Sequence, residues 1–106
     1  MTDDHQLMEE FNKMEQEIVI PYLKKVFNTV GSACCLYHMI EQGEEIYTYL
    51  INGEYVITLE ISRIDNSIIN DGIIAVEEYA KMKKGKQYNS YLKELLELSQ
   101  RSDFQI

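Results

Sequence analysis

The sequence has 106 residues, of which 45% are hydrophobic and 26% are charged. This size and composition favour one globular domain and argue against extensive intrinsic disorder. Eighteen acidic against ten basic residues give a formal net charge of -8, which argues against nucleic acid and anionic membranes as direct partners.

Residues 4–30 have the pattern of an amphipathic helix. Asp3 or Asp4 can cap its start, and Gly31 is expected to end it. Pro21 has no amide hydrogen to donate, so we expect the helix to kink or split there. The apolar stripe recurs at steps of three and four residues and consists of Leu7, Phe11, Met14 and Ile18.

Three runs that follow have the composition of β-strands, over residues 33–40, 46–51 and 55–62. The second and third runs are separated by Asn52-Gly53, which predicts a two-residue type I′ hairpin turn. A second tight turn is expected around Gln42-Gly43. The pattern predicts an antiparallel meander.

A two-residue loop at Asn52-Gly53 determines which side chains share a face of this meander. Glu45 is then expected directly opposite Glu60 on the neighbouring strand. The face expected to pack against the helices carries Cys35, Tyr37, Met39, Ile46, Thr48, Leu50, Tyr55, Ile57, Leu59 and Ile61. The other face is expected to be mixed, aromatic and acidic, with Leu36, His38, Ile40, Glu45, Tyr47, Tyr49, Val56, Thr58, Glu60 and Ser62.

Residues 64–70 are open to three interpretations: a loop, an extended fourth strand or an early helical turn. Asp71 is a plausible cap for a helix over residues 72–84, and a last helix is expected over residues 89–101. The resulting fold class is α+β, a small single domain over residues 1–106 with the order α-β-β-β-α-α. Its three-stranded antiparallel meander packs against the helices.

The two cysteines, Cys34 and Cys35, are neighbours in an expected strand, where adjacent side chains point to opposite faces. A disulfide between them would distort the strand, so reduced thiols and a reducing compartment are expected. No apolar run approaches the roughly 18 residues of a membrane span. The acidic start, Met1-Thr2-Asp3-Asp4, differs from a secretory or organellar leader. These features predict a cytoplasmic protein.

No motif for phosphate, metal or cofactor binding stands out in the sequence. The oxygen-rich segment 65–72 superficially resembles a calcium loop, but its ligand spacing does not match and it is interpreted as a turn. No cofactor, no metal site and no catalytic residue is therefore predicted. This outcome favours a binding protein over an enzyme.

The candidate partner-binding residues combine carboxylates with aromatic side chains. Glu45 and Glu60, as opposed like charges, would suit an arginine or lysine of a partner, although both could also splay into water. Tyr47 and Tyr49 are either recognition residues or cross-strand packing beneath a helix. The remaining candidates are acidic residues at the hairpin tips and one histidine, namely Glu41, Glu44, Glu54 and His38.

These features predict a small acidic inhibitor that occludes a basic, nucleic-acid-handling surface of a partner protein, such as a toxin, nuclease or defence effector. Bacterial immunity proteins or antitoxins and phage anti-defence proteins act in this way. The expected element order and the acidity are similar to those of some phage anti-CRISPR inhibitors, a resemblance of topology and charge alone. Two alternatives remain: a self-associating structural or chaperone-like module, and a small enzyme that uses Glu45 and Glu60 or His38.

Overall fold

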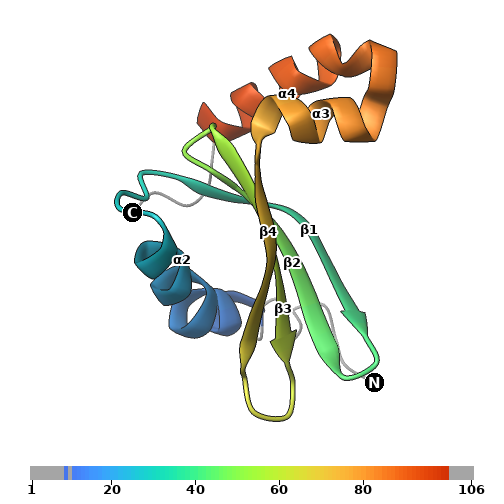
Figure 1. Ribbon diagram of the computed structural model, residues 1–106. Coiled ribbons are helices and arrows are strands. Elements are labelled where there is room, and N and C mark those ends of the chain that lie inside the picture. Colours follow the sequence, from blue (N-terminus) through green and yellow to red (C-terminus); the bar gives the residue numbers. More distant parts are fainter. Residues whose placement is uncertain (1–8, 10, 101–106) are drawn as a thin grey trace. The chain divides into compact units, whose positions relative to one another are not determined.

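The computed structural model describes residue 9 and residues 11–100 (Figure 1). The chain separates into two compact units between Val30 and Gly31. The expectation of a single domain over residues 1–106 stays a prediction. Among the described residues, no helix is both long enough and apolar enough to cross a membrane.

The first unit is helical, with a π-helical stretch directly before its proline. Residues 11–14 are helical and lead into a π-helical stretch, η1 (Glu15–Val19), which is followed by α2 (Ile20–Val26). Pro21 lies in the first turn of α2, and the amide of Ile20 donates to the carbonyl of Glu15, five residues earlier. Val19 and Ile20 keep helical φ and ψ, so the helix runs through Pro21 without the predicted split. The wider π-helical turn directly precedes the residue that has no amide hydrogen to donate.

The helix ends earlier than the sequence predicted. Phe27 is already extended, with φ of -108° and ψ of 134°, so α2 stops at Val26 instead of at Gly31. Asn28, Thr29 and Val30 are all residues of low helix propensity, which accounts for the early end. The expected caps Asp3 and Asp4 and the stripe residue Leu7 lie outside the described residues.

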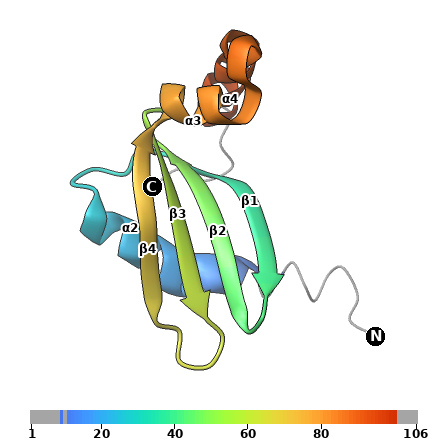
Figure 2. The same cartoon turned by 45° about the vertical axis from the view of Figure 1, so that its right-hand side comes forward.

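The second unit is an α+β arrangement of a four-stranded antiparallel sheet and C-terminal helices. The strands follow the order β1-β2-β3-β4 and are β1 (Ala33–Glu41), β2 (Glu44–Ile51), β3 (Tyr55–Ser62) and β4 (Ile68–Ala75). They are followed by α3 (Val76–Lys84), the 3-10 turn η2 (Gly85–Gln87) and α4 (Tyr88–Gln100). Figure 2 shows the strands side by side, with α3 and α4 beyond the end of the sheet where β4 finishes. The α+β class is confirmed, with one strand more than predicted.

The fourth strand replaces the start of the predicted third helix. Of the three interpretations of residues 64–70, the extended strand is the one observed, beginning at Ile68. It continues through the β-branched pair Ile73 and Ile74, which are opposite Ile57 and Val56 of β3. The helix therefore begins at Val76 instead of Gly72, and the prediction that Asp71 caps it is wrong.

The turn between β2 and β3 has the predicted conformation but one more residue than predicted. Asn52 and Gly53 have φ of 56° and 67°, and the amide of Glu54 donates to the carbonyl of Ile51 over 2.9 Å. However, Ile51 pairs with Tyr55, so Glu54 is an additional loop residue. Its carbonyl accepts a hydrogen bond of 2.8 Å from the amide of Val76, which explains why Glu54 does not pair within the sheet.

This additional residue reverses the facing of β3 relative to the prediction, because side chains alternate along a strand. Glu45 is opposite Ile61, and Glu60 is opposite Ile46. The predicted pairing of Glu45 with Glu60 is therefore wrong, and the two carboxylates lie on opposite faces. One face, here called the groove face, carries Tyr37, Met39, Ile46, Thr48, Leu50, Val56, Thr58 and Glu60.

The core of the second unit lies between the groove face and the C-terminal helices. Its buried members are Leu50, Val56, Tyr79, Ala80 and Leu95. Cys34, Leu36, Ile74, Val76 and Leu92 are among the partly buried residues packed against it. The helices thus cover only the end of the groove face nearest α3, and the rest of that face forms the site described next.

Candidate functional site

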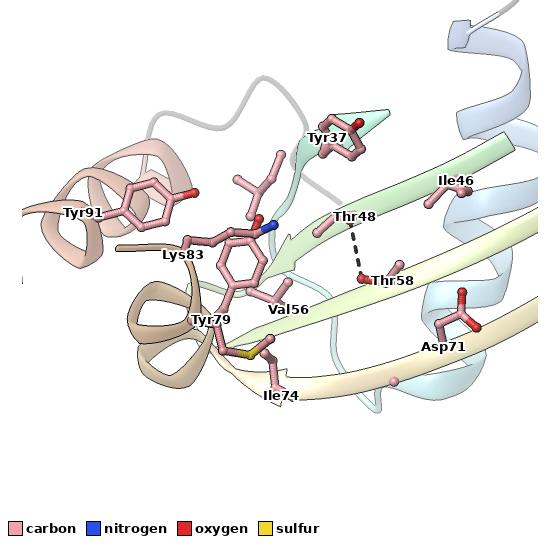
Figure 3. Close-up of a pocket in the computed structure, with 13 residues that line it drawn as sticks. Tyr37, Ile46, Thr48, Val56, Thr58, Asp71, Ile74, Tyr79, Lys83 and Tyr91 are labelled. Atoms are coloured by element: carbon pink, nitrogen blue, oxygen red, sulfur yellow. Dashed lines mark hydrogen bonds between the residues drawn. The ribbon is translucent and has the colours of Figure 1, made fainter. Parts of the chain in front are cut away.

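A groove of about 620 Å³ opens on the groove face, beside the C-terminal helices. It is called the sheet groove here, and Figure 3 shows its lining. The strands β1 to β4 and the helices α3 and α4 all contribute to it. The lining residues are Leu36, Tyr37, Ile46, Thr48, Val56, Thr58, Asp71, Gly72, Ile74, Tyr79, Met82, Lys83 and Tyr91. The volume lies within the range of about 300–1,000 Å³ that is usual for ligand sites.

The floor of the sheet groove is made by two threonines on adjacent strands. Thr48 of β2 is directly opposite Thr58 of β3, and their hydroxyl oxygens are 3.4 Å apart (Figure 3). Thr48 is buried, with 6% of its surface exposed. Because each hydroxyl has the other as a neighbour, this polar floor is satisfied without a ligand. The surrounding surface of Ile46, Val56 and Ile74 is apolar.

Four carboxylates, called the acidic cluster, gather at the end of the groove face away from α3. They are Glu41, Glu44, Glu60 and Asp71. Glu41 and Glu44 are paired across the Gln42-Gly43 turn, and with Glu60 they line a smaller hollow of about 190 Å³. Like charges in adjacent sheet positions repel one another, so this end of the face carries concentrated negative potential.

A β-bulge brings Asp71 into this cluster. The pairing of β3 with β4 shifts by one residue after Thr58, which is opposite Gly72, while Leu59 is opposite Asn70. Asp71 is the extra residue, and the bulge turns its side chain towards Glu60. Gly72, with φ of 134°, supplies the backbone conformation, and its amide donates to Asn70 Oδ1 over 2.9 Å.

Glu60 is the carboxyl group most affected by these neighbours. Hydrogen bonds to Asp71 and to Glu44, followed by desolvation and by the negative charge of both residues, raise the pKa of Glu60 from 4.5 to about 7. The protonated form of Glu60 can donate to a neighbouring carboxylate, whereas the ionised form can only be repelled by it. Near neutral pH the carboxyl group of Glu60 is therefore partly protonated.

The helix end of the sheet groove has aromatic rings and positive charge. Lys83 Nζ lies 5.5 Å from the centroid of the Tyr79 ring, and Lys84 Nζ lies at the same distance from the Tyr91 ring. Burial, followed by the neighbouring Tyr91, raises the pKa of the Tyr79 hydroxyl to about 12. Figure 3 shows Asp71 at one side of the cavity and Lys83, Tyr79 and Tyr91 at the other. The groove is thus polarised along its length.

The predicted candidates on the opposite face are engaged with one another. His38 Nε2 lies 3.2 Å from Glu45 Oε1, and the Tyr47 hydroxyl donates to the same oxygen over 3.4 Å. The His38 and Tyr47 rings are stacked with centroids 4.5 Å apart, and Tyr47 is stacked on Tyr49. Tyr47 and Tyr49 are fully buried. The tyrosines are therefore packed across the strands, which is the second of the two roles that the sequence allowed for them.

The structure therefore divides the predicted partner-binding residues into separate groups. Glu41, Glu44 and Glu60 come together in the acidic cluster, while Glu45 lies on the other face with His38. Glu54 is exposed in the loop at the opposite end of β2 and β3. Partner binding by each of them stays a prediction.

Asp71 and the groove lining were missed by sequence reasoning. Asp71 was interpreted as a helix cap, although a glycine within a run of β-branched residues is also a signal for a bulge. Thr58 was assigned to the opposite face because the predicted register of β3 was wrong. Tyr37 was assigned to the correct face, but it was expected to be covered by the helices. Tyr37, which is 53% exposed, is the most accessible aromatic side chain of the groove.

Metal binding finds no support within the described part of the chain, where no group of three or more histidine, cysteine or acidic residues could hold an ion. Asp65 instead accepts a hydrogen bond of 3.0 Å from the Ser67 amide, which lowers the pKa of Asp65. The predicted turn is observed only at the start of this segment, because Ile68 to Gly72 belong to β4. Cys34 and Cys35 are not joined in a disulfide, and the Cys35 thiol donates to the carbonyl of Tyr37 over 3.5 Å.

In comparisons with known proteins, no protein-family model, curated protein or solved structure matches the chain.

Proposed function

We propose that this chain is a small acidic inhibitor that binds a basic surface of a partner protein and occludes it. The single observation that carries the proposal is the acidic cluster of Glu41, Glu44, Glu60 and Asp71, gathered at one end of an open, largely apolar groove. A cationic partner would relieve the repulsion among these four carboxylates. The apolar residues that line the adjacent groove would provide surface for the partner to bury. The net charge of -8 would accelerate encounter with a basic protein.

The proposed docking surface is the groove face. It replaces the tyrosine-centred surface expected from the sequence, because Tyr47 and Tyr49 are fully buried. The partner would be a nucleic-acid-handling toxin, nuclease or defence effector, as in immunity, antitoxin or phage anti-defence systems. Carboxylates on the inhibitor would then occupy the sites where the partner normally holds phosphate.

The proposal is tested by affinity capture with two charge-matched variants. One combines Glu44→Gln, Glu60→Gln and Asp71→Asn, and the control combines Glu78→Gln, Glu94→Gln and Glu97→Gln on the exposed helix surfaces. The natural chain and the control should retain one stoichiometric basic protein from a lysate of the source organism or its host, and the cluster variant should lose it. Retention by all three chains would overturn the groove face as the docking surface.

Affinity capture combined with light scattering distinguishes the self-associating module. The outer strand β4 carries exposed apolar side chains, Ile69 at 55% and Ile73 at 40%, which favour association through this edge. Light scattering would then give a stable dimer, and no basic partner would be captured.

A carboxylate-dependent enzyme is the remaining candidate, and the raised pKa of Glu60, which lines the smaller hollow of about 190 Å³, favours it. Two carboxyl groups that share a proton are suited to general acid and base roles. Hydrolysis of a panel of chromogenic esters and glycosides, lost in Glu60→Gln and retained in Glu94→Gln, would support this activity.

A further inference from the structure

We propose that the sheet groove receives a single arginine side chain from an exposed segment of the partner, with its guanidinium against Asp71 and Glu60. This inference rests on the proposed function and identifies the chemical group that the groove recognises. It is carried by three features of the groove: its apolar walls, its charge polarity and the arrangement of its carboxyl groups.

The apolar walls fit the stem of a long side chain. Ile46, Val56 and Ile74 line the groove, and Tyr37 at its rim is 53% exposed. An arginine places three methylene groups before its charge, so the stem packs on such walls while the guanidinium reaches further. An exposed tyrosine ring also offers a face on which a guanidinium or a neighbouring peptide group stacks.

The charge polarity restricts the occupant to one cation at one end. Asp71 lies at the end near the acidic cluster, and Lys83 lies at the helix end (Figure 3). A polybasic tract laid along the groove would bring a second positive charge against Lys83. A segment with one arginine, flanked by apolar or acidic residues, avoids that repulsion.

The arrangement of the carboxyl groups favours arginine over lysine. Asp71 and Glu60 come from adjacent strands, and the Glu60 carboxyl group is hydrogen-bonded to both Asp71 and Glu44. A planar guanidinium has five donors in a fixed fork and can bridge two carboxylates, whereas an ammonium group is a point charge. Binding would displace the proton that Glu60 holds.

The test uses the full chain and three soluble probes that differ only in the charged group. They are N-acetyl-leucylarginine amide, its lysine counterpart and its neutral citrulline counterpart. Amide and side-chain carboxyl signals are followed by nuclear magnetic resonance during titration. We expect saturable shifts at Thr58, Gly72 and Asp71 with the arginine probe, together with a fall in the titration midpoint of Glu60. The citrulline probe should bind at least about tenfold more weakly, the loss of one charge-assisted hydrogen bond.

A groove-blocking variant separates this inference from the proposed function. Thr58→Tyr fills the groove without changing any charge, and Ser90→Tyr adds the same ring on α4, outside the lining residues. Folding of both variants is checked from the spectrum without probe. The first should lose arginine binding and the second should retain it.

Equal binding of the arginine and citrulline probes, or shifts spread over carboxylates outside the groove and the acidic cluster, would overturn the inference. In that outcome, loss of partner capture by the Glu44, Glu60 and Asp71 variant would still leave the proposed function standing. Partner capture that survives in that variant would remove the proposed function itself.

Discussion

The carboxyl group of Glu60 on β3 is hydrogen-bonded to the carboxyl group of Asp71, the residue that a bulge adds to β4. Two acidic groups form such a bond only when one of them keeps its proton. The relationship therefore links the local shape of β4 to the protonation of a residue on the neighbouring strand, and it has a consequence for stability.

The stability contributed by Glu60 is expected to fall as the pH rises from about 5 to about 8. The folded state raises the pKa of Glu60 from 4.5 to about 7, so in this window the folded chain binds more protons than the unfolded chain. The favourable contribution is complete below pH 4.5 and is lost as the pH passes through 7. The groups facing Glu60 are Asp71 on β4 and Glu44 on β2, with Glu41 beside them on β1.

Thermal unfolding of the natural chain and of Glu60→Gln measures this effect. Between pH 5 and pH 8, the melting temperature of the natural chain should fall relative to that of the variant, because glutamine does not titrate. Glu94→Gln, an exposed helix position, serves as the control and should follow the natural chain at each pH. A constant difference between Glu60→Gln and the natural chain across this range would contradict the shared proton.

Glu60 and Asp71 illustrate which part of the structure could be predicted from the sequence. The Asn52-Gly53 pair correctly predicted a turn with two left-handed residues, since this preference is local. The facing of Glu60 instead depends on Glu54, whose carbonyl is bound by the amide of Val76, 22 positions further along the chain. No pattern near the turn contains that information, so the prediction put Glu60 beside Glu45 and away from Asp71.

The fold class and part of the site could be predicted from the sequence because the signals for them are local. Hydrophobic alternation and turn residues are local, and they correctly predicted β1, β2, β3 and the last helix to within a few residues. Glu41, Glu44 and Glu60 were selected as acidic residues, which composition reveals. The bulge at Asp71 was not predicted, because Asn70-Asp71-Gly72 is equally typical of the start of a helix.

Asn52 is expected to stabilise the second unit through its side chain as well as through its turn. Its Oδ1 accepts hydrogen bonds from the amides of Gly31, at 2.6 Å, and Ser32, at 3.1 Å. Asn52→Gly keeps the left-handed backbone but removes the acceptor, and should cost about 1–3 kcal/mol of unfolding free energy in denaturant titrations. Asn52→Asp retains the acceptor and should recover most of the loss. Equal destabilisation by both variants would mean that the amide contacts contribute little.

The two hairpin glycines should respond differently to alanine. Gly43 has φ of 83° with nothing within 4 Å of an added Cβ, so Gly43→Ala should cost only backbone strain, about 1–2 kcal/mol. Gly53 has φ of 67°, and an added Cβ would lie 2.9 Å from Ser99 Oγ on α4. Gly53→Ala should therefore lower the unfolding free energy further than Gly43→Ala does. Adding Ser99→Gly to Gly53→Ala should remove most of that excess, and an excess that persists would locate the strain elsewhere.

Neighbouring leucines on α4 should differ sharply in their contribution to stability. Leu95 is 1% exposed, whereas Leu96 is 40% exposed. Leu95 belongs to the core cluster with Leu50 and Tyr79, so Leu95→Ala should leave a cavity and cost about 2–5 kcal/mol. Leu96→Ala removes a side chain that is already partly in water, and its cost should be less than half as large. Denaturant unfolding of the two variants measures the difference, and similar midpoints would show that α4 does not pack on the sheet through Leu95.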